Sequence, residues 1–239
     1  IILRNIFPMR LILRLFVLLI FGFTGYANAG VILTGTRIIY PEGAKDKTLQ
    51  LTNQESQSYI VQVQIDNGTP EGFAPFIVTP PVFRMEPHSG QSVRLTYSGE
   101  PLPGDRESVF YFNFSQLPSL KAGTTQQNKL IFAITNRVKV FYRPASLSGH
   151  PEKTSEHIHL SMEGKQIRIV NQSEYHASVR RATLVRNGKD IRLAEGVMIS
   201  PKSGLVVTPS SEITSLRGLL LRLVLVNDYG VDIVTERRL

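Results

Sequence analysis

Alternation of apolar and polar residues with a period of two dominates the chain after its first 29 residues. It is clearest in residues 59–66, 92–97 and 166–169, and in residues 109–114 three Phe at every second position would share one face. Because successive side chains of a β-strand point to opposite faces, each of these segments predicts a short strand. Pro and Gly interrupt the chain between them, and no long 3.6-residue period appears. Many short strands with regular turns are typical of β-sandwiches, so the chain is predicted to be all-β.

Two local signals refine this prediction. The pair Asn187-Gly188 stands between two strand-like flanks in ATLVRNGKDIRL, and it predicts a hairpin, because a type I′ turn needs positive φ at both central residues. The run Thr79-Pro80-Pro81 predicts a rigid bend. Whether its bonds are cis or trans is left open by the sequence.

A change of composition divides the chain. After FYRP at 141–144 the residues turn polar and loop-like, and strand patterning resumes near Ile158. We therefore predict one domain over residues 30–147 and a second over residues 148–239, each of ordinary size. Pro144 fixes one φ at the junction, which would stiffen the hinge.

The first 29 residues predict a secretory signal peptide. Arg10 and Arg14 precede the apolar run LFVLLIFGF, and the small-x-small triplet at 27–29 is a cleavage signal. Met9 would give a more usual signal peptide, so residues 1–8 are interpreted as lying upstream of the true start. The alternative is an uncleaved membrane anchor, but the apolar run is short for a membrane span.

Composition excludes several classes of function. The chain has no Cys, hence no disulfide framework and no thiolate metal site. Its net charge is +8, and removal of residues 1–29 takes away three Arg and no acid, which leaves +5. This mild positive charge could steer an acidic partner. No stripe of Arg and Lys interleaved with aromatics indicates nucleic-acid binding.

The stretch LIFAITNRVKVFYRP at 130–144 carries the strongest functional signal. Leu130, Phe132 and Ile134 would share one face of an extended strand, and Lys139 follows among apolar residues. Lys is seldom buried without a partner. One interpretation is a core strand whose Lys139 extends to water. The other is a strand that receives a second chain, in which the apolar row takes its side chains and the cation takes a carboxylate.

Six motifs in the same order resemble those of the periplasmic pilus chaperones, the PapD-like family of the chaperone–usher pathway. The resemblance covers nearly all of the chain after residue 29, and the motifs are TRIIYPEGAKDKTLQLTN (36–53), FIVTPPVFRMEP (76–87), LPGDRESVFYFN (102–113), RVKVFYRP (137–144), MISPKS (198–203) and NDYG (227–230). It implies two immunoglobulin-like sandwiches arranged in an L. It also implies a periplasmic chaperone that lends a strand to a pilus subunit (donor-strand complementation) and delivers it to an outer-membrane usher.

The resemblance also assigns roles to three groups of residues. The anchor for the subunit's C-terminal carboxylate falls on Arg37 and Lys139. The donor strand falls on Asn128, Leu130, Phe132 and Ile134. An interdomain salt-bridge network, which would fix the angle between the domains, falls on Glu107, Arg143 and Asp228.

Other groups of residues give weaker functional signals. His157 and His159 would share a face of a strand, but no third ligand completes a metal site, so neither a metal nor a cofactor is expected. No catalytic motif is present, and no enzyme activity is expected. The alternatives are a secreted two-domain adhesin or structural surface protein, and a hydrolase or sugar-binding enzyme on a sandwich fold. The first would not need the paired cations Arg37 and Lys139 at a cleft. The second would need two carboxylates, or a nucleophile with a base, in one pocket, and the sequence shows neither.

The sequence leaves the partners and the self-association of the protein open. It does not identify the pilin, the usher or the fibre type. Some relatives shield the donor strand by dimerising, and the exposed row of this chain would favour such self-association. No membrane span is expected after signal cleavage.

Overall fold

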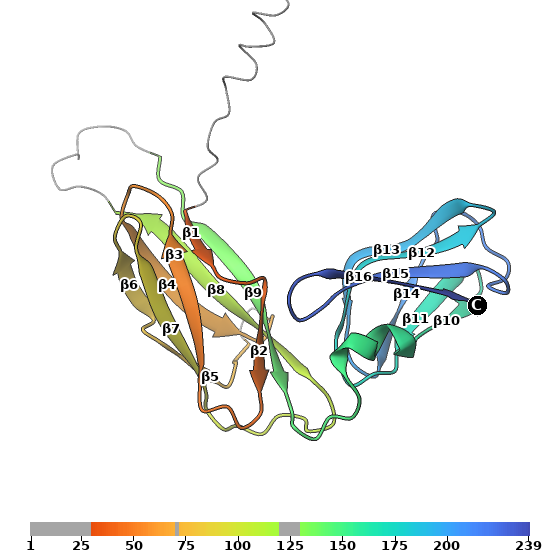
Figure 1. The fold of residues 1–239 in the computed structure, drawn as a ribbon, viewed down its shortest axis with the longest axis horizontal. Coiled ribbons are helices and arrows are strands. Elements are labelled where there is room, and N and C mark those ends of the chain that lie inside the picture. Colours follow the sequence, from red (N-terminus) through yellow and green to blue (C-terminus); the bar gives the residue numbers. More distant parts are fainter. Residues whose placement is uncertain (1–29, 70–71, 120–129) are drawn as a thin grey trace, which may run out of the picture.

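The computed structural model describes residues 30–69, 72–119 and 130–239 of the chain. The predicted signal peptide and Asn128 lie outside these residues. The described residues form sixteen strands and one 3-10 helix, gathered into two lobes that meet at an angle (Figure 1). The chain is therefore all-β, as its alternating pattern predicts.

The N-terminal lobe consists of a four-stranded sheet and a five-stranded sheet. All pairings are antiparallel except that of β2 with β9. In spatial order the first sheet is β1 (Val31–Leu33), β3 (Lys47–Asn53), β7 (Gly90–Tyr97) and β5 (Phe76–Thr79). The second is β2 (Arg37–Pro41), β9 (Ile134–Arg143), β8 (Ser108–Pro118), β4 (Tyr59–Asp66) and β6 (Val82–Met85).

The chain changes sheets between β1 and β2. Gly35, in the short connection between them, has a φ of +94°, which a residue with a Cβ adopts only with strain. The crossing brings β2 beside the second half of β9 and β1 beside β3. As a result the first half of β9 is left without β2 as a neighbour.

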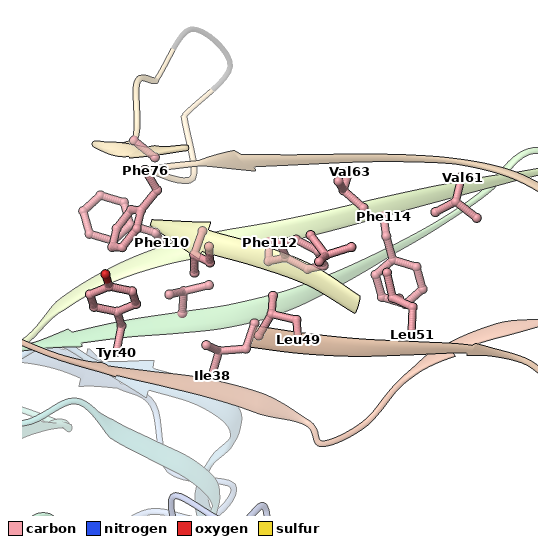
Figure 2. Close-up of a cluster of buried hydrophobic side chains, with 14 of the residues drawn as sticks. Ile38, Tyr40, Leu49, Leu51, Val61, Val63, Phe76, Phe110, Phe112 and Phe114 are labelled. Atoms are coloured by element: carbon pink, nitrogen blue, oxygen red, sulfur yellow. The ribbon is translucent and has the colours of Figure 1, made fainter. Parts of the chain in front are cut away.

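The core of this lobe lies between its two sheets. Alternate residues of facing strands point inward, as the two-residue period requires, and Leu51, Val61 and Phe112 have no exposed surface. Figure 2 shows this cluster with Phe76, Phe110 and Phe114 among its larger members. Aromatic pairs add to it, such as the edge-on contact of Phe76 with Tyr40 at 5.2 Å between ring centroids.

The C-terminal lobe is a second sandwich. One sheet contains β10 (Ile158–Glu163), β11 (Gln166–Asn171) and β14 (Ser203–Val207). The other contains β13 (Lys189–Ile199), β12 (Ala177–Arg186), β15 (Leu220–Val226) and β16 (Asp232–Arg238). Ile158, Leu184 and Leu221 are fully buried in its separate core. The predicted hairpin is confirmed, because Asn187 and Gly188 join β12 to β13 with φ of +51° and +74°.

A 3-10 helix, η2 (Pro151–His157), leads into the second lobe. The Arg237 guanidinium donates hydrogen bonds to the carbonyl oxygens of Ser155, Glu156 and Ile158, which lie at the end of this helix. His157 is the last residue of this helix, whereas His159 lies in β10, so the prediction that both share a strand is wrong. The helical turn extends to the point where the pairing of β10 with β11 begins. The Thr79-Pro80 bond is cis.

Candidate functional site

Two cations lie side by side at the centre of the candidate site. Arg37 begins β2 and lies opposite Lys139 of β9, and because the two strands are parallel and in register, both side chains project from the same face of the sheet. Arg37 Nη1 donates a hydrogen bond to the carbonyl oxygen of Val226 at 2.9 Å, at the end of β15 in the other lobe. The cation pair therefore lies where the two lobes face each other.

The surroundings disfavour the charge of both side chains. Burial lowers the pKa of Arg37, and the carboxylates of Asp228 and Glu107 oppose that effect. Burial also lowers the pKa of Lys139, and the positive charge of Arg37 lowers it further. Among the described residues no carboxylate stands against Lys139 Nζ, so this half-buried ammonium lacks the partner that burial of a charge ordinarily requires.

Arg37 retains an unused donor. Its Nε is buried and has no hydrogen-bond partner among the residues described, and its guanidinium carbon lies 5.9 Å from the centroid of the Phe141 ring. It borders a pocket between the lobes, whose lining includes Phe141, Tyr175, Leu225 and Tyr229. A hydrogen-bonding anion that reached Arg37 would satisfy this donor and offset the charge.

The apolar row that precedes Lys139 in the chain is exposed. Four neighbouring side chains have large fractions of their surface in solvent: Leu130 81%, Ile131 43%, Phe132 67% and Ile134 55%. These exposures exclude an ordinary core strand at this end. All four line a hollow together with Tyr59, Gln116 and Pro118.

The regular strand begins later than the sequence predicts. β9 starts at Ile134, so Leu130 and Phe132 precede it and do not alternate with buried neighbours. The pairing of β9 with β8 ends where Ile134 meets Gln116, although β8 continues to Pro118, and residues 130–133 have no strand partner among the described residues. A strand without a hydrogen-bonded neighbour is not stable by itself, which explains the difference.

The first half of β9 also has an unpaired edge. β8 lies on one side of it, whereas β2 pairs only with residues 139–143. Within the part of the chain that the structure describes, no strand adjoins residues 134–138 on the side away from β8. Unpaired backbone groups beside exposed apolar side chains form a ready template for another strand.

A second cluster of charges joins the lobes. Arg143, in the last position of β9, contacts Glu107 Oε1 at 2.8 Å and Asp228 Oδ2 at 2.7 Å. The Glu107 side chain is only 2% exposed. Although burial works against the charge, the hydrogen bonds of Asp228 and Glu107 raise the pKa of Arg143 above its ordinary value. Arg143 thus connects a carboxylate of its own lobe with one from the other.

Comparison with known proteins gives the family. Residues 30–148 match the family described as "Pili and flagellar-assembly chaperone, PapD N-terminal domain", and residues 153–236 match "Pili assembly chaperone PapD, C-terminal domain". The chain belongs to the PapD-like family of pilus-assembly chaperones. It is 40% identical to chaperone protein HifB of Haemophilus influenzae over 220 residues, which cover 86% of each chain.

Two further comparisons support membership of this family. Chaperone protein MrkB of Klebsiella pneumoniae is 34% identical over 232 residues, 94% of this chain and 97% of MrkB. The crystal structure of the YadV chaperone superimposes with a TM-score of 0.77 at 30% identity and covers 88% of this chain and 100% of its own. The paired sandwiches of this chaperone are therefore the fold of its family.

Three contacts of the chaperone could not be predicted from its sequence. His176 precedes β12, and both its backbone N–H and its Nδ1 contact Glu107 Oε2, at 2.9 and 3.0 Å. The Tyr175 ring lies under Arg143, with 5.2 Å between the guanidinium carbon and the ring centroid. The backbone N–H of Glu107 donates to the carbonyl oxygen of Glu174 at 2.9 Å. No motif marks these residues, because their role depends on a turn of one lobe meeting the other.

The described residues hold no group of three His, Cys, Asp or Glu side chains arranged to bind a metal ion. The same residues contain no helix long and apolar enough to cross a membrane.

Proposed function

We propose that this chaperone binds one pilus subunit by donor-strand complementation in the space between its lobes. Strand β9 and the exposed residues before it would extend a sheet of the subunit, with Leu130, Phe132 and Ile134 filling its open core. The unpaired edge of residues 134–138 and the exposure of this row support the proposal. Asn128, which falls outside the described residues, is expected to begin the row.

The subunit's C-terminal carboxylate would bind to Arg37 and Lys139. The observation that carries this proposal is the half-buried Lys139, next to a second cation and without a carboxylate partner in the described part of the chain. A carboxylate would supply the missing charge, and its hydrogen bonds to two cations would be of the strong, charge-assisted kind.

The salt-bridge network would hold the two lobes at the angle that this binding requires. Arg143, Glu107 and Asp228 are close enough to act as one unit, and the contacts of His176 with Glu107 add to it. The domains would then be residues 30–147 and 148–239, with the network close to their junction. A rigid angle would place the anchor and the donor row in register for the same subunit.

We further propose that the chaperone acts in the periplasm after removal of residues 1–29, without catalysis, and passes its subunit to an outer-membrane usher. Folding free energy withheld by the borrowed strand would be released when the next subunit's strand replaces it, so no nucleotide is needed. Shielding of the free donor row by a second chaperone molecule is compatible with the exposed side chains of the row.

The test is co-expression in a bacterial periplasm with the pilin encoded beside this chaperone, followed by pull-down. The wild type should retain a soluble subunit, and a folded Lys139→Ala variant should not. Equal retention by both would contradict the anchor. Failure of the wild type to retain any subunit would contradict the chaperone function for that pilin.

A further inference from the structure

The beginning of the described chain is held by a carboxylate. The backbone nitrogen of Gly30 donates to Glu55 Oε1 at 2.9 Å, and its carbonyl oxygen accepts from the N–H of Gln54 at 3.1 Å. Gly30 is buried. A Cβ at this position would lie 2.6 Å from Gln116 Oε1, so a larger residue would have to displace that side chain. The site thus accommodates a glycine whose nitrogen faces Glu55.

Three hydrogen bonds besides that of Gly30 hold Glu55 in place. Its other oxygen, Oε2, accepts hydrogen bonds from the Tyr59 hydroxyl and from Gln57 Nε2, and its own N–H donates to Asn53 Oδ1 at 3.0 Å. The hydrogen bond from Tyr59, with those from Gln57 and Gly30, keeps the pKa of Glu55 below its ordinary value despite some desolvation. The carboxylate is therefore ionised at neutral pH and directs one oxygen at the nitrogen of Gly30.

Gly30 also directly follows the predicted cleavage site. Hydrolysis of the Ala29–Gly30 peptide bond by a signal peptidase adds one water and leaves a carboxylate on Ala29 and an ammonium group on Gly30. The neutral N–H that faces Glu55 would become a cation with three donors. A hydrogen bond between two ions is stronger than one between an ion and a neutral amide.

We propose that Glu55 is the binding site for the new N-terminal ammonium group of Gly30, so that signal cleavage itself completes an ion pair that fixes the start of β1. This inference rests on the secretory processing in the proposed function, and it assigns a role to residues outside the anchor, the donor row and the network.

The location connects this ion pair with subunit binding. Val31, the first residue of β1, donates its N–H to Gln116 Oε1 at 2.6 Å. Tyr59 donates to Glu55, and both Tyr59 and Gln116 line the same hollow as the exposed row. Fixing Gly30 therefore fixes one wall of the space in which the subunit would lie. A processed chain would present that wall in one arrangement, whereas a chain that still carries residues before Gly30 would lack the ion pair.

The experiment is a thermodynamic cycle on the full processed chaperone. Glu55→Gln is made in two backgrounds, one that starts at Gly30 and one with a single Ala added before Gly30, which keeps the N–H but moves the ammonium one residue away. At pH 6 we expect Glu55→Gln to lower the melting temperature by about 2–4 °C more in the chain that starts at Gly30. An equal loss in both backgrounds would overturn the proposal, because the amide hydrogen bond alone would then explain the contact.

A pH series on the chain that starts at Gly30 gives an independent measurement. An ammonium paired with Glu55 has a folded-state pKa above its unfolded value, which is about 7.7–8.0 for an α-amino group. Its stabilisation is therefore complete below that value and disappears as pH rises through the folded-state pKa. The wild type should lose its advantage over Glu55→Gln between pH 8 and 10. An advantage that stays constant over this range would contradict an ionic contact.

Two controls keep the outcomes separate. Glu86→Gln removes a surface carboxylate that contacts Ser58 and Arg84 but not Gly30, and it should give no difference between the two backgrounds. Mass spectrometry of the secreted chaperone must find Gly30 as its first residue, and another start would overturn the proposal. Subunit retention is measured separately, so a chaperone that retains its subunit without this coupling refutes the inference and leaves the proposed function standing.

Discussion

Arg37 and Lys139 stand opposite each other on two parallel strands, with both positive charges on one face and partly shielded from water. Proteins seldom place like charges together in this way, because each charge disfavours the charged form of the other side chain. Arg37 donates one hydrogen bond to the other lobe, and its buried Nε has no hydrogen-bond partner among the described residues. Lys139 faces no carboxylate in the same part of the chain. The free chaperone thus carries an electrostatic cost that an arriving anion would remove.

Replacement of Lys139 should raise the stability of the free chaperone and abolish its binding of the subunit. In Lys139→Met the apolar stem is kept and the repulsion from Arg37 is lost, so the melting temperature of the free chaperone should rise by roughly 1–3 °C, a modest effect because half of the side chain is still in water. Subunit retention should disappear. Calorimetry and pull-down measure the two effects. Lys165→Met, which changes an exposed Lys of the second lobe, should alter neither. A destabilised Lys139→Met would contradict the electrostatic argument.

Subunit affinity should fall at alkaline pH. In the free chaperone burial and Arg37 hold the pKa of Lys139 below its ordinary 10.5, and a bound carboxylate would raise it again. Binding therefore takes up a proton in this range. Affinity is complete below the free-state pKa and falls as pH rises from there through the pKa of the complex.

The dissociation rate of the purified complex from pH 7 to pH 10 measures this linkage. Lys139→Arg stays charged throughout and should flatten the dependence. If the wild type and Lys139→Arg show the same pH profile, Lys139 is not the titrating group.

A charge in the apolar row should weaken subunit binding. Ile134→Asp places a carboxylate where an apolar pocket of the subunit is expected, and we expect roughly 10- to 100-fold lower affinity. Ile134 is 55% exposed, so the free chaperone should fold normally. Ile77→Asp is the matched control, because Ile77 is 58% exposed on β5, in the other sheet of the lobe. Similar losses in both variants would indicate a general effect of charge and not a contact of the row.

Loss of Arg143 should loosen the two lobes. Arg143→Met leaves the buried Glu107 without its cation, which costs about 3 kcal/mol because an unpaired charge remains in the interior. Small-angle scattering should then report a wider range of interdomain angles. Lys202→Met provides the comparison: it removes an interlobe ion pair with Asp105 that is largely exposed, and such pairs contribute about 0–1 kcal/mol. If the two variants give identical scattering profiles, the network does not set the angle.

Much of this fold could be predicted because its causes are local. The alternation in residues 59–66 fixes which face of β4 is buried, and the structure buries Tyr59, Val61 and Val63 accordingly. Asn187 and Gly188 form the predicted turn because both tolerate positive φ. The start of β9 could not be predicted in the same way, because it depends on where its pairing with the distant strand β8 ends.

The same distinction between local and long-range causes applies to the candidate site. The sequence by itself determined the strand pattern, the two lobes, the family motifs and the unusual Lys139, because each is written in neighbouring residues. Only the tertiary structure decided that Arg37 and Lys139 stand in register on two parallel strands, that His176 contacts Glu107 and that Glu55 receives Gly30. These pairs are 102, 69 and 25 residues apart in the chain, and they meet because strands from distant segments pair and the two lobes pack against each other.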